Sequence, residues 1–380
     1  MGIADLTRNA VHVLPDGALE AKLALGRPLR VKLGIDPTGS DIHIGFAVVL
    51  NRLRAFQDAG HIAVLIVGDY TARIGDPSGR SVERKVLPDE VLDRNAKLFA
   101  EQAYRILDRE RTEIRFNGEW LGSLDYAELV RLTRMGTVAQ LLERNDFRER
   151  YESGNPISVS ELLYPFAQAY DSVAVEADIE VGGTDQLYNL LMGRDVMTHY
   201  GLEPQSIITY ELLVGTDGVE KMSKSVGNYI GIDDPPEEQF GKAMSIPDSA
   251  LDQWWRLALD RERPGGEPMV EKLALARGIV ERYHGPEAAR EAEGHFTRVV
   301  REGRAPEEIP SVPLPDGDPV HVPALLATCF GLSTSEARRM IGQGGVRIDG
   351  EPLTELDVPR TRLSGAVLQA GKRRFVQLRG

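Results

Sequence analysis

The stretch GIDPTGSDIHIGF, residues 34–46, contains residue types that are suited to binding phosphate. It leaves a short apolar run and enters a segment with helical spacing, and the free N–H groups at a helix start attract anions. Gly45 would let a nucleotide approach the backbone closely, while Thr38 and His43 can donate hydrogen bonds to phosphate oxygens. A single histidine is more often a packed or capping residue, so this prediction depends on the motifs that accompany it.

A second stretch with possible phosphate chemistry is GTDGVEKMSKS, residues 215–225. Lys221 and Lys224 stand three residues apart after a predicted strand that ends in glycine. Two ammonium groups on a loop could close over a triphosphate and neutralise the charge that develops on a pyrophosphate leaving group. A lysine pair alone is usually a solvated surface, but the string Lys-Met-Ser-Lys-Ser is specific.

A third stretch, YPFAQAYD, predicts a small polar site on a helix. Tyr164, Gln168 and Asp171 are spaced by four and three residues, which places them on one helical face. Asp171 could accept a hydrogen bond from a buried phenol. A ligand without that hydroxyl would leave the carboxylate unpaired, which favours tyrosine over phenylalanine.

These motifs together resemble a known family. HIGF followed by KMSKS is similar to the paired signatures of class I aminoacyl-tRNA synthetases, and YPFAQAYD, IGDPSGR and VGGTDQ narrow the resemblance to the tyrosyl-tRNA synthetases. The resemblance covers essentially the whole chain. It implies a tyrosine–tRNA ligase that activates L-tyrosine with ATP, releases pyrophosphate and transfers tyrosyl to the 3′ end of tRNA. It also implies a homodimer, and Mg²⁺ that accompanies ATP.

The resemblance assigns tyrosine-binding roles to residues that match its motifs. Asp76, Tyr164 and Gln168 would hold the substrate ammonium group. Asp171 would accept the phenol hydrogen bond, and Gln186 would contact the substrate carboxylate or the α-phosphate.

The resemblance also implies a nucleotide site. The residues expected to bind ATP are Asp36, Gly45, Phe46, Gly183, Asp185 and Lys224. The residues expected to act in catalysis are Thr38, His43, Lys221, Lys224, Arg80 and Arg84. The tyrosine carboxylate is itself the attacking group, so catalysis would consist of positioning and charge stabilisation without a protein nucleophile. For Arg80 and Arg84 a solvated surface is an equally good interpretation.

Two positions depart from the family pattern. Phe46 replaces the second histidine of the signature; it cannot donate a hydrogen bond, but its ring could line the nucleotide site by packing. Lys32 stands where many tyrosyl enzymes have a tyrosine that shares the phenol contact. We predict that Lys32 pairs with Asp69, which ends the next predicted strand.

Two alternatives remain open from the sequence. An RNA-binding or chaperone-like paralogue could have kept the fold and lost catalysis, with Phe46 as the trace of that loss. A related enzyme could activate tryptophan, because the tryptophan enzymes have a similar pocket with a similarly placed aspartate. Gln168 favours tyrosine, since the tryptophan enzymes tend to carry an apolar residue there.

The elements around these motifs predict an α/β fold. Apolar strand patterns at 30–36 and 61–69 flank a segment with helical spacing at 45–60, which makes a βαβ unit and implies a parallel sheet. Neither GxGxxG nor GxxxxGK occurs, so phosphate would be bound differently from those loops. We predict a Rossmann-like catalytic domain over 1–225, with a helical insertion at about 88–160.

The rest of the chain predicts two more domains. Helical spacing indicates an α-helical anticodon-binding domain at 226–305, and a proline-rich stretch at 306–319 indicates a semi-rigid linker. Residues 320–380 resemble the small α+β RNA-binding fold of ribosomal protein S-four, with nine Lys/Arg against five Asp/Glu. The RNA-binding candidates are Arg338, Arg339, Arg347, Lys372 and Arg373.

Composition supports an ordinary globular protein in the cytoplasm. Hydrophobic residues make up 42% and charged residues 27% of the 380 residues, and the net charge of −13 argues against indiscriminate nucleic-acid binding. No apolar run approaches the ~20 residues of a membrane span, and MGIADLTRNA lacks the layout of a signal peptide. The single cysteine, Cys329, excludes an intramolecular disulfide and predicts no metal site.

Overall fold

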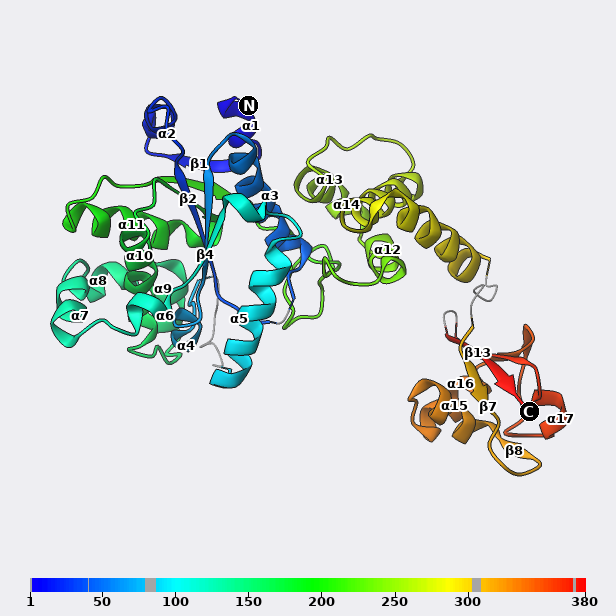
Figure 1. Cartoon of the computed structure of the whole chain (residues 1–380). Helices are drawn as coiled ribbons and strands as arrows, with labels where there is room; N and C mark the ends of the chain where they lie inside the picture. The colour runs from blue at the N-terminus through cyan, green and yellow to red at the C-terminus, as the bar shows by residue number, and fades with distance from the viewer. Residues whose placement is uncertain (1, 40, 79–86, 303–308, 372–373) are drawn as a thin grey trace. The chain divides into compact units, whose positions relative to one another are not determined.

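The computed structural model describes residues 2–39, 41–78, 87–302, 309–371 and 374–380 (Figure 1). The chain divides into two compact units, which are Met1–Asp234 with Lys242–Leu275, and Pro235–Gly241 with Ala276–Gly380. Within the described ranges, no helix combines the length and the apolar character needed to cross a membrane.

A six-stranded sheet forms the centre of the first unit, in the order β1-β6-β5-β2-β3-β4. The strands are β1 (Ala10–Leu14), β2 (Arg30–Ile35), β3 (Ile62–Val67), β4 (Thr112–Phe116), β5 (Ile179–Gly183) and β6 (Ser206–Tyr210). Strands β2 to β6 pair in parallel, and β1 is an antiparallel edge strand on β6. The chain order reverses between β2 and β5, where ligands of such sheets bind at the carboxyl ends of the strands. The predicted α/β class is confirmed.

Helices cover both faces of this sheet. Figure 1 shows α10 (Tyr164–Ala174) and α11 (Leu187–His199) on one side of the strands, with α3 (Ile44–Asp58) and α5 (Asp89–Ala103) on the other. Covering both faces explains why β3 reads as the continuous apolar run IAVLIV, in which five of six residues are buried.

The segment between 88 and 160 is not helical throughout. The helices α5, α6 (Gly118–Leu121), α7 (Tyr126–Thr133), α8 (Val138–Leu142) and α9 (Asn145–Glu152) lie there as expected, but Thr112–Phe116 forms β4. The purely helical interpretation is therefore wrong at these five residues. The sequence TEIRF has only a weak hydrophobic pattern because no residue of this edge strand is fully buried. Its extended conformation is instead determined by pairing with β3.

Shorter elements complete the first unit and lead into the second. The remaining described helices up to residue 301 are α1 (Ile3–Leu6), α2 (Ala18–Leu23), α4 (Thr71–Ile74), α12 (Pro236–Met244), α13 (Leu251–Ala258) and α14 (Pro268–Phe296). They are accompanied by the short 3-10 helices η1 (Arg109–Arg111), η2 (Glu161–Leu163), η3 (Thr184–Gln186) and η4 (Asp248–Ala250) and by the π-helix η5 (Thr297–Arg301). Helix α14 is interrupted at Gly285, whose φ of 88° is not helical, directly before Pro286.

The carboxyl-terminal part of the second unit contains a five-stranded sheet in the order β10-β9-β12-β13-β7. Its elements, with the accompanying helices and a two-stranded ladder, are β7 (Ser311–Pro313), β8 (Val320–His321), α15 (Val322–Phe330), α16 (Thr334–Gly342), β9 (Val346–Ile348), β10 (Glu351–Pro352), β11 (Asp357–Val358), α17 (Arg360–Leu363), β12 (Val367–Ala370) and β13 (Arg374–Arg379). The predicted linker at 306–319 is wrong at 311–313, because β7 pairs with β13. Pro313 is tolerated there because β7 is an edge strand.

A buried ion pair joins β2 to β5. Lys32 lies opposite Glu180 in the register of the two strands, and its Nζ is 2.9 Å from Glu180 Oε1. Nζ also donates to Ser172 Oγ at 2.7 Å and to the Gln168 carbonyl oxygen at 3.1 Å. The side chains of the pair are 0% and 2% exposed, so each charge depends on the other for compensation.

The predicted pair between Lys32 and Asp69 is wrong. The residue of β3 opposite Lys32 is Val64, whereas Asp69 comes two residues after the end of that strand. Asp69 instead accepts a hydrogen bond from the Gly118 N–H at 2.8 Å. Because β3 follows β2 in the chain, the sequence suggested that the partner of Lys32 lies on β3. Strand β2 also pairs with β5 on its other side, and only the sheet topology reveals this second neighbour.

We predict that Lys32→Met lowers the free energy of unfolding by about 3–5 kcal/mol, because the Glu180 carboxylate stays buried without its ammonium partner. The double variant Lys32→Met/Glu180→Gln should recover most of the loss. Urea unfolding followed by circular dichroism measures both. As a control, Arg54→Met breaks a pair with Asp58 whose side chains are 40% and 45% exposed, and should cost below about 1 kcal/mol. A loss no greater than this control would contradict the prediction.

Candidate active site

One cavity of about 420 Å³ opens at the carboxyl ends of β2, β3 and β5. It is lined by every described residue that the sequence predicted for catalysis or for binding tyrosine and ATP. These are Asp36, Thr38, His43, Gly45, Phe46, Asp76, Tyr164, Gln168, Asp171, Gly183, Asp185, Gln186, Lys221 and Lys224. Arg80 and Arg84 lie outside the described residues.

A buried carboxylate forms one part of the wall. Asp171 on α10 is 2% exposed; its Oδ1 accepts from Trp120 Nε1 at 2.8 Å and its Oδ2 from Asn117 Nδ2 at 3.2 Å. Burial raises the pKa of Asp171 to about 7, against the opposite effects of Lys32 and of these two hydrogen bonds. The carboxylate is thus held in one orientation and keeps a lone pair on each oxygen for a ligand.

Asn117 and Trp120 belong to the site although no sequence motif indicated them. Both follow β4, the strand that the helical interpretation also missed. A polar residue and a tryptophan just beyond a strand end are a usable signal, but only once that strand has been recognised. Both residues were therefore overlooked for the same reason, which is that β4 was not predicted.

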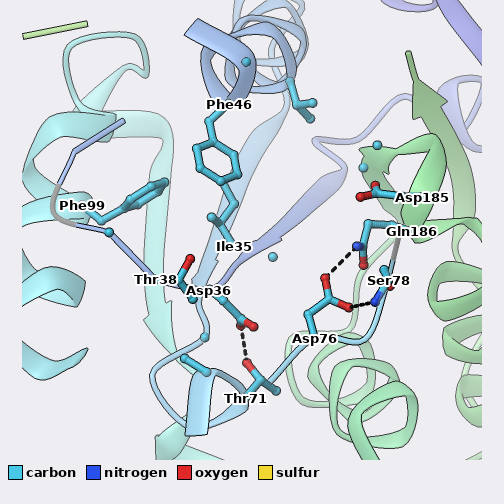
Figure 2. A pocket seen from close by; sticks show the side chains of 18 of the residues that line it. Ile35, Asp36, Thr38, Phe46, Thr71, Asp76, Ser78, Phe99, Asp185 and Gln186 are labelled. Atoms are coloured by element: carbon cyan, nitrogen blue, oxygen red, sulfur yellow. Dashed lines mark hydrogen bonds between the residues drawn. The ribbon is translucent and has the colours of Figure 1, made fainter. Parts of the chain in front are cut away.

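A second carboxylate, Asp76, is also held through both oxygens. Its Oδ1 accepts the Ser78 N–H at 2.9 Å and its Oδ2 accepts Gln186 Nε2 at 3.0 Å (Figure 2). Gln168, from α10, lines the same cavity. An ammonium group entering here would meet an oriented anion together with an amide oxygen.

Asp36 follows β2 and connects two further polar groups. Its Oδ1 accepts from Thr71 Oγ1 at 2.7 Å, as Figure 2 shows, and its Oδ2 accepts from the Tyr164 hydroxyl at 3.1 Å. Gly68 makes this possible, since a Cβ at that position would lie 2.2 Å from Asp36 Oδ1. The glycine here serves close packing of polar groups.

His43 is the residue before α3 and is 5% exposed. Its ring stacks on Phe46 with centroids 4.3 Å apart and an interplanar angle of 24°, and Phe46 meets Phe99 edge-on at 5.9 Å. Burial, together with the positive charges of Lys224 and Lys221, lowers the pKa of His43 to about 3. The imidazole is therefore neutral near pH 7 and can donate one N–H to an anion.

The two lysines of the KMSKS stretch reach the cavity from a different loop. Lys221 Nζ lies 3.0 Å from Asp185 Oδ2, and Lys224 Nζ lies 3.5 Å from Asp41 Oδ2. Burial lowers the pKa of Lys224, while Asp41 opposes that shift. The loop contacts the start of α3 through Met222, whose sulfur accepts the Gly45 N–H at 3.2 Å. Phosphate-binding candidates from two distant motifs are thereby brought together.

A metal site and an RNA-binding surface are two other classes of site to which the sequence relates. In the part of the chain that the structure describes, no group of three His, Cys, Asp or Glu residues is arranged to hold a metal ion. The RNA-binding candidates lie in the second unit: Arg338 and Arg339 are exposed on α16, and Arg347 is exposed on β9. Lys372 and Arg373 are outside the described residues.

Comparison with known proteins finds a matching family model and similar full-length relatives. The model of tRNA synthetases class I (W and Y) matches residues 24–298. A tyrosine–tRNA ligase of Thermotoga maritima is 46% identical over 99% of this chain and 96% of its own length. One of Moorella thermoacetica is 46% identical over 98% of this chain and 94% of its own length.

Solved structures share the fold. A tyrosyl-tRNA synthetase of Archaeoglobus fulgidus complexed with L-tyrosine superposes with a TM-score of 0.60 at 23% identity, covering 77% of this chain and 98% of that one. A C-terminally truncated mitochondrial tyrosyl-tRNA synthetase of Coccidioides posadasii gives 0.60 at 20% identity, covering 77% and 90%.

We predict that the His43 imidazole stays neutral in the ligand-free protein down to about pH 4, because protonation would bury a cation beside two lysines. In the unfolded chain the group takes up a proton near pH 6.5. The free energy of unfolding should therefore fall as the pH drops from about 6.5 towards 3, and His43→Asn should remove this part of the pH dependence. NMR of ¹⁵N-labelled histidines tests it directly; titration of His43 above pH 5.5 would rule the idea out.

Proposed function

The chain belongs to the bacterial tyrosyl-tRNA synthetase family within class I, and on this premise we propose which residues carry out its reaction. It is a tyrosine–tRNA ligase that uses ATP as a substrate. The observation that carries the residue assignments is that an oriented, buried carboxylate, a neutral histidine and two lysines line the same cavity.

The tyrosine substrate would be held at both of its ends. The phenol would donate to Asp171, whose two oxygens are already oriented by Asn117 and Trp120. The ammonium group would bind Asp76 together with Tyr164 and Gln168, and the substrate carboxylate would lie near Gln186. Phenylalanine would leave the buried Asp171 carboxylate without its last hydrogen bond, which explains the selection for a hydroxyl.

The first reaction step would need only positioning and charge stabilisation. The tyrosine carboxylate attacks the α-phosphorus of ATP, the bond to the β-phosphate oxygen breaks, and pyrophosphate leaves with the electron pair. Thr38, His43, Lys221 and Lys224 would stabilise the negative charge that spreads over the phosphates. In the second step the ribose hydroxyl at the tRNA end attacks the tyrosyl carbonyl, and AMP leaves.

The nucleotide would reorganise one ion pair. Asp185 is proposed to bind the ATP ribose, but it contacts Lys221 in this structure at 3.0 Å. Binding of the ribose would release Lys221 towards the pyrophosphate. Gly45 and Gly183 would let the nucleotide approach the backbone, and Asp36 would complete the site.

Phe46 is compatible with activity in this arrangement. Its ring stacks on His43 at 4.3 Å and so restrains the imidazole that faces the phosphates. Losing one donor near the ribose would cost about 1–3 kcal/mol, which is small against the acceleration of an enzyme. We therefore prefer an active enzyme to an inactive RNA-binding paralogue.

Mg²⁺ would enter with ATP and take its ligands mainly from the phosphates, since no described cluster offers a dedicated cage. It would supply additional charge neutralisation at the phosphates. Arg80 and Arg84 are proposed as further pyrophosphate contacts.

The remaining proposals concern RNA and assembly. The 226–305 region would read the anticodon, and residues 320–380 would bind folded RNA through Arg338, Arg339, Arg347, Lys372 and Arg373. We propose a cytoplasmic homodimer formed through the inserted helical region. Exposed large apolar or aromatic side chains in that region support this proposal, and they include Tyr126 at 82%, Val138 at 60%, Tyr151 at 67% and Val159 at 76%.

We predict that the protein catalyses ATP–pyrophosphate exchange that depends on tyrosine. Tryptophan in the same assay should support less than about one hundredth of the rate, because the full-length relatives are tyrosine–tRNA ligases and Gln168 stands where the tryptophan enzymes tend to carry an apolar residue. Phe46→His should raise the rate by no more than about a hundredfold, the effect of regaining one hydrogen-bond donor. An inactive wild type that becomes active as Phe46→His would instead identify a paralogue that lost catalysis, and exchange that prefers tryptophan would identify the other alternative.

We predict that Asp171→Asn lowers the ratio of kcat/KM for tyrosine to that for phenylalanine by at least about tenfold. Sites that hydrogen-bond a substrate hydroxyl reach ratios of 10⁴–10⁵, a magnitude that is taken from this same family of enzymes. The asparagine would present its own N–H to one of the donors Asn117 and Trp120. Asp185→Asn is the matched control, for which we expect a higher KM for ATP and an unchanged ratio. An unchanged ratio in Asp171→Asn would remove Asp171 from phenol recognition.

A further inference from the structure

A chain of buried and half-buried side-chain hydrogen bonds connects the inserted segment to Asp76. We name it the amide relay and define it as Arg144, Asn189, Gln168 and Gln186. Arg144 and Asn189 belong to none of the sequence motifs, and neither lines the cavity. They are nevertheless buried, at 7% and 1% exposure.

The guanidinium of Arg144 is held in place by residues outside the amide relay. It is the residue before α9, and its guanidinium binds both oxygens of Asp146, with Nε 3.1 Å from Oδ1 and Nη2 2.7 Å from Oδ2. The rings of Phe147 and Tyr188 lie 5.1 Å and 4.9 Å from its central carbon. Its remaining donors are therefore directed to set positions.

The guanidinium determines which way the Asn189 amide faces. Arg144 Nη1 lies 2.8 Å from Asn189 Oδ1, and because guanidinium has donors only, an oxygen must occupy this position. The Asn189 Nδ2 then faces Gln168 Oε1 and Gln186 Oε1, each at 3.0 Å. One cation thus sets the direction of three amides.

The relay ends on the carboxylate that is proposed to bind the substrate ammonium group. With its Oε1 bound to Asn189, Gln186 turns its Nε2 to Asp76 Oδ2 at 3.0 Å. A second branch runs from Arg144 Nη2 to Ser78 Oγ at 3.1 Å, and the Ser78 N–H donates to Asp76 Oδ1 at 2.9 Å. A reversed Gln186 would place an amide oxygen against Asp76, with no hydrogen between the two acceptors.

We propose that Arg144 and Asn189 are positioning residues for tyrosine binding, because they orient the amides of Gln168 and Gln186 and, through Gln186 and Ser78, the Asp76 carboxylate. This inference rests on the proposed role of Asp76, Gln168 and Gln186 at the ammonium and carboxylate of tyrosine. It extends the function of the inserted segment, since Asn117 and Trp120 of that segment hold Asp171 and Arg144 would hold the groups around Asp76.

The test is the KM for each substrate in ATP–pyrophosphate exchange with the full-length protein. Asn189→Leu has a similar shape and removes both the acceptor for Arg144 and the donor to the glutamines. We expect the KM for tyrosine to rise about tenfold to a hundredfold, while the KM for ATP stays within about threefold. Thermal unfolding by circular dichroism verifies that each variant is folded.

A matched control is Gln57→Leu. Gln57 is a 1% exposed amide that donates to the backbone carbonyls of Asp108 at 3.1 Å and Arg111 at 2.8 Å, away from the cavity. It should lose stability without a selective change in the KM for tyrosine. If Asn189→Leu behaves like this control, Asn189 is merely structural and the proposal is overturned.

If Asn189→Leu does not fold, two variants of Arg144 test the same positioning role. Arg144→Lys keeps a cation that only donates, so the KM for tyrosine should stay within about threefold of the wild type. Arg144→Met removes the donor and should raise it about tenfold. Equal KM values for tyrosine in the two variants would overturn the proposal. A wild type without tyrosine-dependent exchange would instead refute the proposed function.

Discussion

The register between β2 and β5 is the constraint on which the site depends, because the chain order reverses between these strands. Lys32 and Glu180 hold this register with a 2.9 Å ion pair from which water is excluded. The same ammonium group binds the Gln168 carbonyl and Ser172 in α10. The helix that carries Gln168 and Asp171 is therefore attached directly to the centre of the sheet. A charge pair of this kind contributes little net stability, but breaking it is costly, so it favours one arrangement over others.

The cavity has two ends of different charge, with the Asp171 carboxylate at one end and the Lys221 and Lys224 ammonium groups at the other. At Asp171 burial raises the pKa, while two N–H donors and a nearby ammonium keep the carboxylate oriented and favour its charge. At His43 burial and two lysines keep the ring neutral, so the positive charge at this end comes from Lys221 and Lys224. A hydroxyl-bearing ligand and a triphosphate would thus meet complementary groups in one cavity.

The polar groups that touch a ligand are themselves held by residues behind them. Asp36, Asp76 and Asp171 each accept hydrogen bonds on both oxygens, and apart from the Ser78 N–H at Asp76 the donors are at least 35 residues away in the chain. Rigid placement of this kind reduces the reorganisation needed when substrates bind. The amide relay extends the same principle to neutral side chains, whose direction only an unambiguous donor such as Arg144 can determine.

The sequence by itself determined the α/β class, the family and the group of residues that line the cavity, because these depend on local patterns and on the short motifs that carry Thr38, His43, Asp171 and Lys221. Tertiary structure decided the rest. The sequence did not indicate β4, and with it Asn117 and Trp120, because an edge strand of five half-buried residues has almost no pattern of its own. Lys32 was assigned to Asp69 because sequence order suggests β3 as the neighbour, whereas the topology places β5 on its other side. Partners of buried charges are chosen by strand register and burial, and neither can be read from residues that are more than a hundred positions apart.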